Sequence, residues 1–111
     1  MSNTAPVVEV QTLKSFLAER LNVSRCLKDS DHDFIFNLAS PVTNSQVVGL
    51  INEYYAQNPD GLRLMEFDDR ELQGRLEQNG VEIGLITVSN YIEQIFVTIA
   101  TVHQTIASVP R

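Results

Sequence analysis

Residues 88–109, VSNYIEQIFVTIATVHQTIASV, decide how this chain is expected to fold. Aliphatic residues recur here at alternating spacings of four and three, which keeps them on one face of an α-helix. They are Val88, Ile92, Ile95, Ile99, Val102, Ile106 and Val109. The segment contains one carboxylate, Glu93, and neither lysine nor arginine. A helix with so little charge is expected to pack on two sides, so we predict a long apolar C-terminal helix.

The same stretch has an alternative interpretation over residues 94–102. Isoleucine, valine and threonine favour strands, so an edge strand is the alternative for this part. The helix is preferred because the spacing holds along the whole segment. Asn90 followed by Glu93 also has the spacing of an N-terminal capping pattern, and it lies where the predicted helix would begin.

The N-terminal third predicts a leader, a helix and a hairpin. Residues 1–8 are expected to form a flexible leader, and residues 9–111 a single domain. Residues 23–28 and 34–39 predict two strands joined by an acidic turn, which is typical of a hairpin. Between the leader and this hairpin, the sequence predicts a helix from about Val10 to Asn22. Its apolar face consists of Leu13, Phe16, Leu17 and Leu21.

Two capping patterns predict helices in the middle of the chain. Thr43 with Gln46 has the capping-box spacing and opens a helix that ends before residues 58–61, Asn-Pro-Asp-Gly. Asp68 with Glu71 repeats the pattern and predicts a short helix over residues 69–78.

The two segments that flank this short helix predict strands. Residues 62–67 form one strand, and residues 81–87 form the other after a left-handed stop at Asn79-Gly80. Alternation in the second strand places Val81, Ile83 and Leu85 on one face.

The fold class that follows is α+β, with the element order α-β-β-α-β-α-β-α. We expect a small, mostly antiparallel sheet of three or four strands, four helices and the long apolar C-terminal helix. A small α/β sheet is the alternative, because strands and helices alternate strictly after residue 33.

Composition excludes several classes of function. The chain has 111 residues, a formal net charge of −6 and a sequence pI of about 4.7. Such acidity opposes binding to nucleic acid or to an anionic membrane. A lone cysteine, Cys26, excludes an intrachain disulfide and a cysteine zinc site. No signal peptide or membrane span is predicted, so a cytoplasmic protein is expected.

No catalytic set, cofactor site or metal site is predicted. Asp29, Asp31 and Asp33 resemble the start of a calcium loop, but the sixth and twelfth positions lack the required glycine and glutamate. These aspartates and His32 are therefore interpreted as an exposed turn. Cys26 has no assignable base and is interpreted as a packing residue.

The predicted C-terminal helix is also the candidate interface between two copies of the chain. Its contact residues are Tyr91, Ile92, Ile95, Phe96, Ile99, Val102, His103 and Ile106. The adjacent Tyr54 and Tyr55 are candidate partner contacts, because one of two neighbouring helical tyrosines is expected to remain exposed.

In size, pI and element content the chain is similar to small acidic secretion chaperones, which are α+β dimers that bind extended segments of a client. Small acidic immunity proteins and adaptor subunits fit the same outline. The missing catalytic set, the acidic surface and the apolar C-terminal helix favour a non-enzymatic protein-binding module that acts as a chaperone, inhibitor or assembly factor. We expect a homodimer that binds another protein as its partner, and the acidic surface would steer it towards a basic one.

Two alternatives to this function are kept open. The first is a small ligand-binding or catalytic subunit that uses the acidic turn around Asp31 and His32, or Cys26. The second is a structural or phage-type assembly component, which would form higher oligomers.

Overall fold

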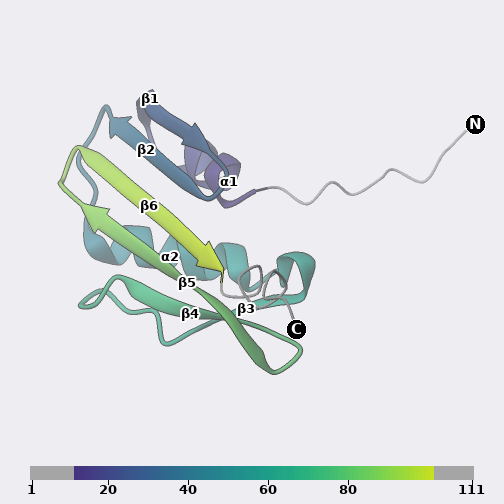
Figure 1. Ribbon diagram of the computed structural model, residues 1–111. Helices are drawn as coiled ribbons and strands as arrows, with labels where there is room; N and C mark the ends of the chain where they lie inside the picture. Colours follow the sequence, from purple (N-terminus) through teal and green to yellow (C-terminus); the bar gives the residue numbers. More distant parts are fainter. Residues whose placement is uncertain (1–11, 102–111) are drawn as a thin grey trace, which may run out of the picture.

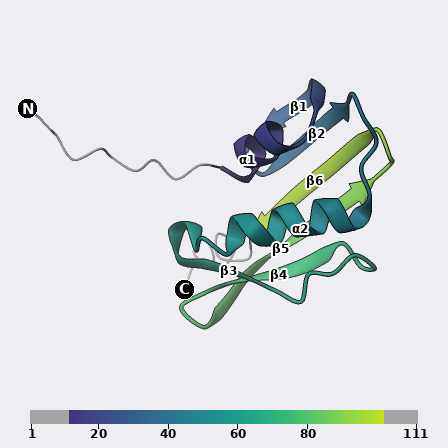
Figure 2. The same ribbon diagram turned by 180° about the vertical axis from the view of Figure 1, so that it is seen from behind.

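Two helices cover one face of a six-stranded antiparallel sheet in the computed structural model (Figures 1 and 2), which describes residues 12–101. The strand order is β1-β2-β6-β5-β4-β3. The predicted leader, residues 1–8, lies outside the described residues. The elements are α1 (Leu13–Arg20), β1 (Val23–Ser30), β2 (Asp33–Leu38), α2 (Asn44–Tyr55), the 3₁₀ turn η1 (Pro59–Gly61), β3 (Leu62–Met65), β4 (Gln73–Gln78), β5 (Val81–Asn90) and β6 (Gln94–Thr101).

The predicted C-terminal helix is wrong over its described residues. Residues 88–90 end β5, and residues 94–101 form β6, which lies between β2 and β5. The alternative of a strand is confirmed over the described residues 94–101, but its edge position is wrong, because the strand is central. Ile95 and Val97 are fully buried on one face of β6, while Phe96 lies on the other. A central strand with apolar residues on both faces satisfies the helical spacing by coincidence.

The predicted helix over residues 69–78 is also wrong. The Asp68 carboxylate does accept the backbone N–H groups of Arg70 and Glu71, both at 3.0 Å, but the chain then enters β4. These bonds lower the pKa of Asp68, with the bond from Glu71 as the larger cause. Asn90 likewise accepts the N–H of Ile92 at 2.9 Å inside the β5–β6 turn. The same side-chain bonds cap helices and close short turns, so the capping spacing alone does not distinguish the two.

Asn79-Gly80 is the turn of a β-hairpin and not the end of a helix. Both residues have positive φ, 54° for Asn79 and 80° for Gly80, as a two-residue type I′ turn requires. The hairpin adds β4 to the sheet, so the predicted sheet of three or four strands and the four helices are both wrong. The α/β alternative is wrong as well, because every strand pair is antiparallel.

The remaining predicted elements are confirmed. The hairpin of β1 and β2 forms around the acidic turn, and α1 and α2 lie where their apolar patterns placed them. The capping box of α2 is complete, since Thr43 accepts the N–H of Gln46 at 3.1 Å and Gln46 accepts the N–H of Thr43 at 2.7 Å.

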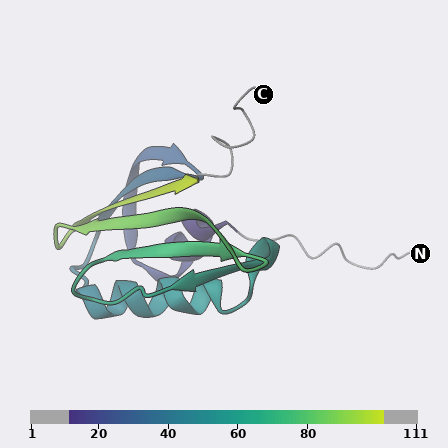
Figure 3. The ribbon, with the colours of Figure 1, turned by 60° about the horizontal axis from the view of Figure 1, so that its bottom comes forward.

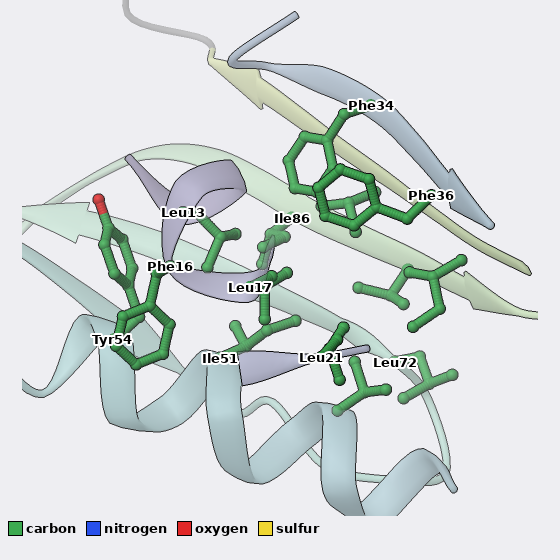
Figure 4. Packing of buried hydrophobic residues seen from close by; sticks show 14 of the residues in the cluster. Leu13, Phe16, Leu17, Leu21, Phe34, Phe36, Ile51, Tyr54, Leu72 and Ile86 are labelled. Atoms are coloured by element: carbon green, nitrogen blue, oxygen red, sulfur yellow. The ribbon is translucent and has the colours of Figure 1, made fainter. Parts of the chain in front are cut away.

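The hydrophobic core lies between the helices and the sheet (Figure 4). Phe34 and Phe36 of β2 pack with ring centroids 5.1 Å apart, and Leu17 and Ile51 face the sheet from the two helices. The strand β5 contributes alternate residues, with Ile86 and Val88 buried. On the other face of β5, Leu85 is only partly exposed, and Val81 at the start of the strand is 59% exposed.

Gly84 is expected to be the most sensitive glycine of the sheet. A Cβ at this position would lie 2.3 Å from the backbone oxygen of Ala100, so the neighbouring strand would have to move. We expect Gly84→Ala to lower the free energy of unfolding by about 3 kcal/mol. Gly49→Ala is the matched control, because its Cβ meets nothing within 4 Å and helix α2 should gain about 0.5–1 kcal/mol. Urea unfolding of both variants measures the difference. Equal stability of the two variants would contradict the close approach of β5 and β6.

Candidate functional site

No described element covers the face of the sheet that points away from the helices (Figure 3). Strand pairing places Ile35 opposite Phe96, Thr87 opposite Thr98, and Leu85 opposite Ala100 on this side. We call this surface the open face. Its residues on the four inner strands are Asp33, Ile35, Asn37, Gln94, Phe96, Thr98, Ala100, Leu85, Thr87, Ser89, Gln73 and Arg75.

The centre of the open face is uncharged and partly apolar. Ile35, Leu85 and Phe96 are all partly exposed there. The ring of Tyr91, which is 63% exposed, packs edge-on against Phe96 with a centroid distance of 5.3 Å. Ile92 is also 63% exposed and has a φ of 75°, a conformation that is rare for a β-branched residue. An exposed aromatic pair and a strained isoleucine therefore stand beside this surface.

Charges lie at the two flanks of the open face and differ in sign. At the β1 flank, Arg25 lies opposite Asn37 and Lys28 lies opposite Ile35, and the Lys28 ammonium binds the Asp33 carboxylate at 2.6 Å. This flank carries a net positive charge.

The opposite flank, around β3 and β4, is dominated by carboxylates. Arg75 binds Glu66 at 2.6 Å and Glu82 at 3.7 Å, and Arg63 binds Glu77 at 3.6 Å. Asp68 and Glu71 line a hollow of about 560 Å³ together with Arg75 and Leu85. The β3–β4 flank therefore carries a net negative charge.

A cavity of about 280 Å³ lies on the helix side, at the end of the sheet where β6 ends. We call it the tyrosine cavity. Its walls combine aliphatic side chains with carboxylates, a histidine and two tyrosines. The lining residues are Thr12, Leu13, Asp31, His32, Tyr54, Tyr55, Asp60, Leu62, Leu76, Ile83, Ile99 and Thr101.

Tyr54 and Tyr55 are both buried, 7% and 5% exposed, so neither is the exposed contact that the sequence predicted. Their rings meet edge-on with centroids 4.8 Å apart. Figure 4 shows Tyr54 on α2 beside Phe16, whose ring centroid is 5.4 Å away. Burial raises the pKa of both tyrosines, and Asp60 and Asp31 raise that of Tyr54 further. Both phenols are therefore protonated at neutral pH and keep a hydrogen-bond donor.

The acidic turn borders the tyrosine cavity and is fixed to β6. The backbone N–H of Ile99 donates to the carbonyl of His32 at 2.8 Å. The Lys14 ammonium binds Asp29 and lies 3.6 Å from Asp31. The hydrogen bond to Asp29 is the main cause that raises the pKa of Lys14. The turn predicted as a solvated loop thus forms one wall of the cavity.

Asp60 enters the cavity wall from η1, where its φ of 55° places it in the left-handed region. Asparagine and aspartate tolerate this region better than most residues, and Asn58 has a φ of 53°. The side-chain amide of Gln78 donates to the Asp60 carbonyl at 2.8 Å and holds this turn against β4. The sequence does not indicate Asp60 as a site residue, because residues 58–61 predict only the end of a helix.

The predicted interface residues do not form one stripe. Tyr91 and Ile92 lie in the β5–β6 turn and Phe96 lies on the open face, whereas Ile95 and Ile99 face the helices. Three further predicted contacts lie outside the described residues, and they are Val102, His103 and Ile106. The predicted contact residues did not include Ile35 and Leu85, which lie on the open face. Alternation in β2 and β5 places each of them on the other side of its strand from a buried neighbour.

Cys26 is exposed on the edge strand β1, and its Sγ–H donates to the carbonyl of Lys28 at 3.2 Å. It is therefore not the packing residue that the sequence predicted. Within residues 12–101, no three His, Cys, Asp or Glu side chains converge as a metal site. None of the helices in the described part of the chain has the length and apolarity needed to cross a membrane. Comparison with protein-family models, curated proteins and solved structures gives no match.

Proposed function

We propose that this chain is a non-enzymatic protein-binding module that works as a homodimer, with the open face as the contact between the two copies. The observation that carries the proposal is that the helices cover one face of the sheet, while the other presents an uncharged, partly apolar centre. Exposed apolar surface flanked by polar residues is typical of protein interfaces. This seam replaces the C-terminal helix expected from the sequence.

The charges at the flanks favour a second copy as the occupant of the open face. A two-fold axis that runs parallel to the strands, between β5 and β6, lays the β1 flank of one copy over the β3–β4 flank of the other. Arg25 and Lys28 then approach the carboxylate-rich side that includes Glu66 and Glu71. The same contact is made twice, as a self-complementary interface requires.

The size of the open face also suits a dimer. Six strands about 4.8 Å apart and about seven residues long present roughly 600 Å² per copy. Two such faces bury about 1,200 Å², which is the lower limit of standard-size interfaces. Two packed sheets would keep their strands within about 30° of each other.

The strained Ile92 supports a role for the β5–β6 turn, at the edge of the open face, in the contact between the two copies. A non-glycine residue in the left-handed region costs about 1–2 kcal/mol, and here the residue is also apolar and exposed. Such strain is concentrated at functional positions, where a contact made in the complex compensates for it.

The dimer leaves the helix side of each copy available for a client protein. The net charge of −6 favours a basic client through long-range attraction. Chaperone, inhibitor and assembly factor are the roles that this arrangement supports, and a cytoplasmic location is part of the proposal. Catalysis by the isolated chain is not expected.

Light scattering over a concentration series tests the dimer, and charge reversal tests its orientation. We expect Lys28→Glu and Glu71→Lys each to raise the dimer dissociation constant about three- to tenfold, because each brings like charges together. The double variant should restore wild-type affinity, since it re-forms opposite charges across the interface.

Glu19→Lys on α1 is the matched control, because Glu19 lies on the helix side and should leave the dissociation constant unchanged. A wild-type monomer at all concentrations would overturn the proposal. A dimer in which the double variant shows no rescue would overturn the proposed orientation of the two copies.

A further inference from the structure

We propose that Ile92 anchors the contact between the two copies, and that Asn90 is a positioning residue that holds the β5–β6 turn in the conformation which this contact needs. These two roles rest on the proposed dimer and name the residues that make it specific. Within one copy, the side chain at position 92 costs stability and adds nothing to the core, and this conflict calls for a contact outside the copy.

The backbone at Ile92 has a geometry that isoleucine adopts only at a cost. The N–H of Glu93 donates to the carbonyl of Tyr91 at 2.8 Å, and the φ of Ile92 between them is 75°. This hydrogen bond and this angle are those of a classic γ-turn, which is rare and strained. Glycine adopts the left-handed region freely, whereas a β-branched residue there is a genuine outlier. The turn itself would therefore be more stable with glycine at position 92.

The side chain of Ile92 does not offset this cost within its own copy. Among residues 12–101, Ile92 lies outside the hydrophobic core, and it is 63% exposed. Tyr91 beside it is exposed to the same extent, and its ring packs on Phe96. Neither the turn nor the core requires an isoleucine here, so its apolar side chain points to a contact with another molecule.

Asn90 fixes the strained turn through both polar atoms of its side-chain amide. Its Oδ1 accepts the N–H of Ile92 at 2.9 Å, and its Nδ2 donates to the carbonyl of Val42 at 3.1 Å and to Oδ1 of Asn44 at 2.9 Å. The carbonyl of Ile92 also accepts the N–H of Val42 at 3.2 Å. These bonds tie the turn to the segment that enters α2. The exposed side chains are thus held in place before a partner binds, which lowers the entropy cost of association.

The symmetry of the proposed dimer makes a second copy the partner of this turn. The two-fold axis runs parallel to the strands between β5 and β6, and residues 91–93 join these two strands. The turn therefore lies at the axis, where each residue approaches its own counterpart in the second copy. The two Ile92 side chains then form one apolar contact beside the paired rings of Tyr91 and Phe96. Removal of this surface from water compensates for the backbone strain.

Ile92→Gly tests the anchor, because glycine relieves the strain and removes the apolar side chain. At protein concentrations far below the dissociation constant, where urea unfolding reports on the single copy, the midpoint of unfolding should rise. Light scattering should give a dimer dissociation constant about tenfold higher than that of the wild type. Asn58→Gly is the matched control. Asn58 also has a positive φ, 53°, but it lies directly after α2, so the dissociation constant should not change.

A double-mutant cycle with Asn90→Ala tests the positioning role. Alone, this substitution should raise the dissociation constant about fivefold, because the turn loses the side-chain bonds that fix it. In the Ile92→Gly background it should raise the constant less than about twofold, since the anchor that Asn90 positions is already absent. A residue that only stabilises the fold would have the same effect in both backgrounds. Circular dichroism shows that each variant is folded.

An unchanged dissociation constant in Ile92→Gly would overturn the anchor and leave the proposed dimer standing. A lower unfolding midpoint in this variant would also overturn it, because Ile92 would then stabilise its own copy. Equal effects of Asn90→Ala in the two backgrounds would overturn the positioning role. A wild-type monomer at all concentrations would overturn the proposed function itself, so the two failures are distinguishable.

Discussion

Ile95→Asp is expected to prevent folding, whereas Thr98→Asp, three residues further along β6, is expected to leave the fold intact. Ile95 is fully buried between the sheet and the helices, opposite Phe36 of β2 and Asn90 of β5. Aspartate there would lose the apolar contacts and bury an unpaired charge, which costs several kcal/mol and approaches the whole stability of a small domain. Circular dichroism and urea unfolding measure the outcome.

Thr98 is the informative control because it is exposed on the open face. Residues three apart lie on the same side of a helix but on opposite faces of a strand. Thr98→Asp should cost about 1 kcal/mol, through the lower strand propensity of aspartate. If both variants unfolded, or both folded normally, the assignment of opposite faces to these residues would be contradicted.

The strand β6 shows why local sequence patterns predicted a helix where the sheet has a central strand. Its apolar residues on both faces, from Ile95 to Ile99, satisfied a helical spacing and a strand propensity at once. Only the pairing partners decide between the two, and β2 is more than fifty residues away in sequence. The lack of charge, taken to indicate a helix packed on two sides, results instead from the central place of β6 in the sheet.

Capping patterns predicted one of the three tested helices correctly. Thr43 is followed by a twelve-residue segment with an apolar face, so its capping box opens α2. Asp68 and Asn90 make similar side-chain bonds, but each is followed by a strand. In contrast, the Asn-Gly pair at residues 79 and 80 was the stronger signal for a hairpin, because both positions require positive φ.

The candidate sites could be predicted only in part. Phe96, Tyr91, His32 and Tyr55 are candidates from the sequence, but local patterns do not show which of them share a surface. The open face depends on the pairing of β2 with β6, and the tyrosine cavity brings together residue 31 from the β1–β2 turn, residue 55 from α2 and residue 60 from η1. Such long-range neighbours follow from the strand order, which no local spacing encodes.

Phe96→Glu is expected to convert the proposed homodimer into a folded monomer. Phe96 lies near the middle of the open face, on β6, and its ring contacts Tyr91. Loss of a central aromatic contact typically costs 2–4 kcal/mol, which raises the dissociation constant about 30- to 1,000-fold. Near a two-fold axis, the new carboxylates of the two copies would also lie close to each other and repel.

Val81→Glu is the matched control for this variant. Val81 is an apolar residue with 59% exposure at the start of β5, beside the Asn79-Gly80 turn and away from the centre of the open face. The same substitution there adds the same charge but should leave the dimer mass unchanged. Light scattering gives the mass, and circular dichroism shows that each variant is folded. A folded Phe96→Glu variant with the dissociation constant of the wild type would rule out the open face as the dimer contact, because a charge at its centre could not be tolerated in a packed interface.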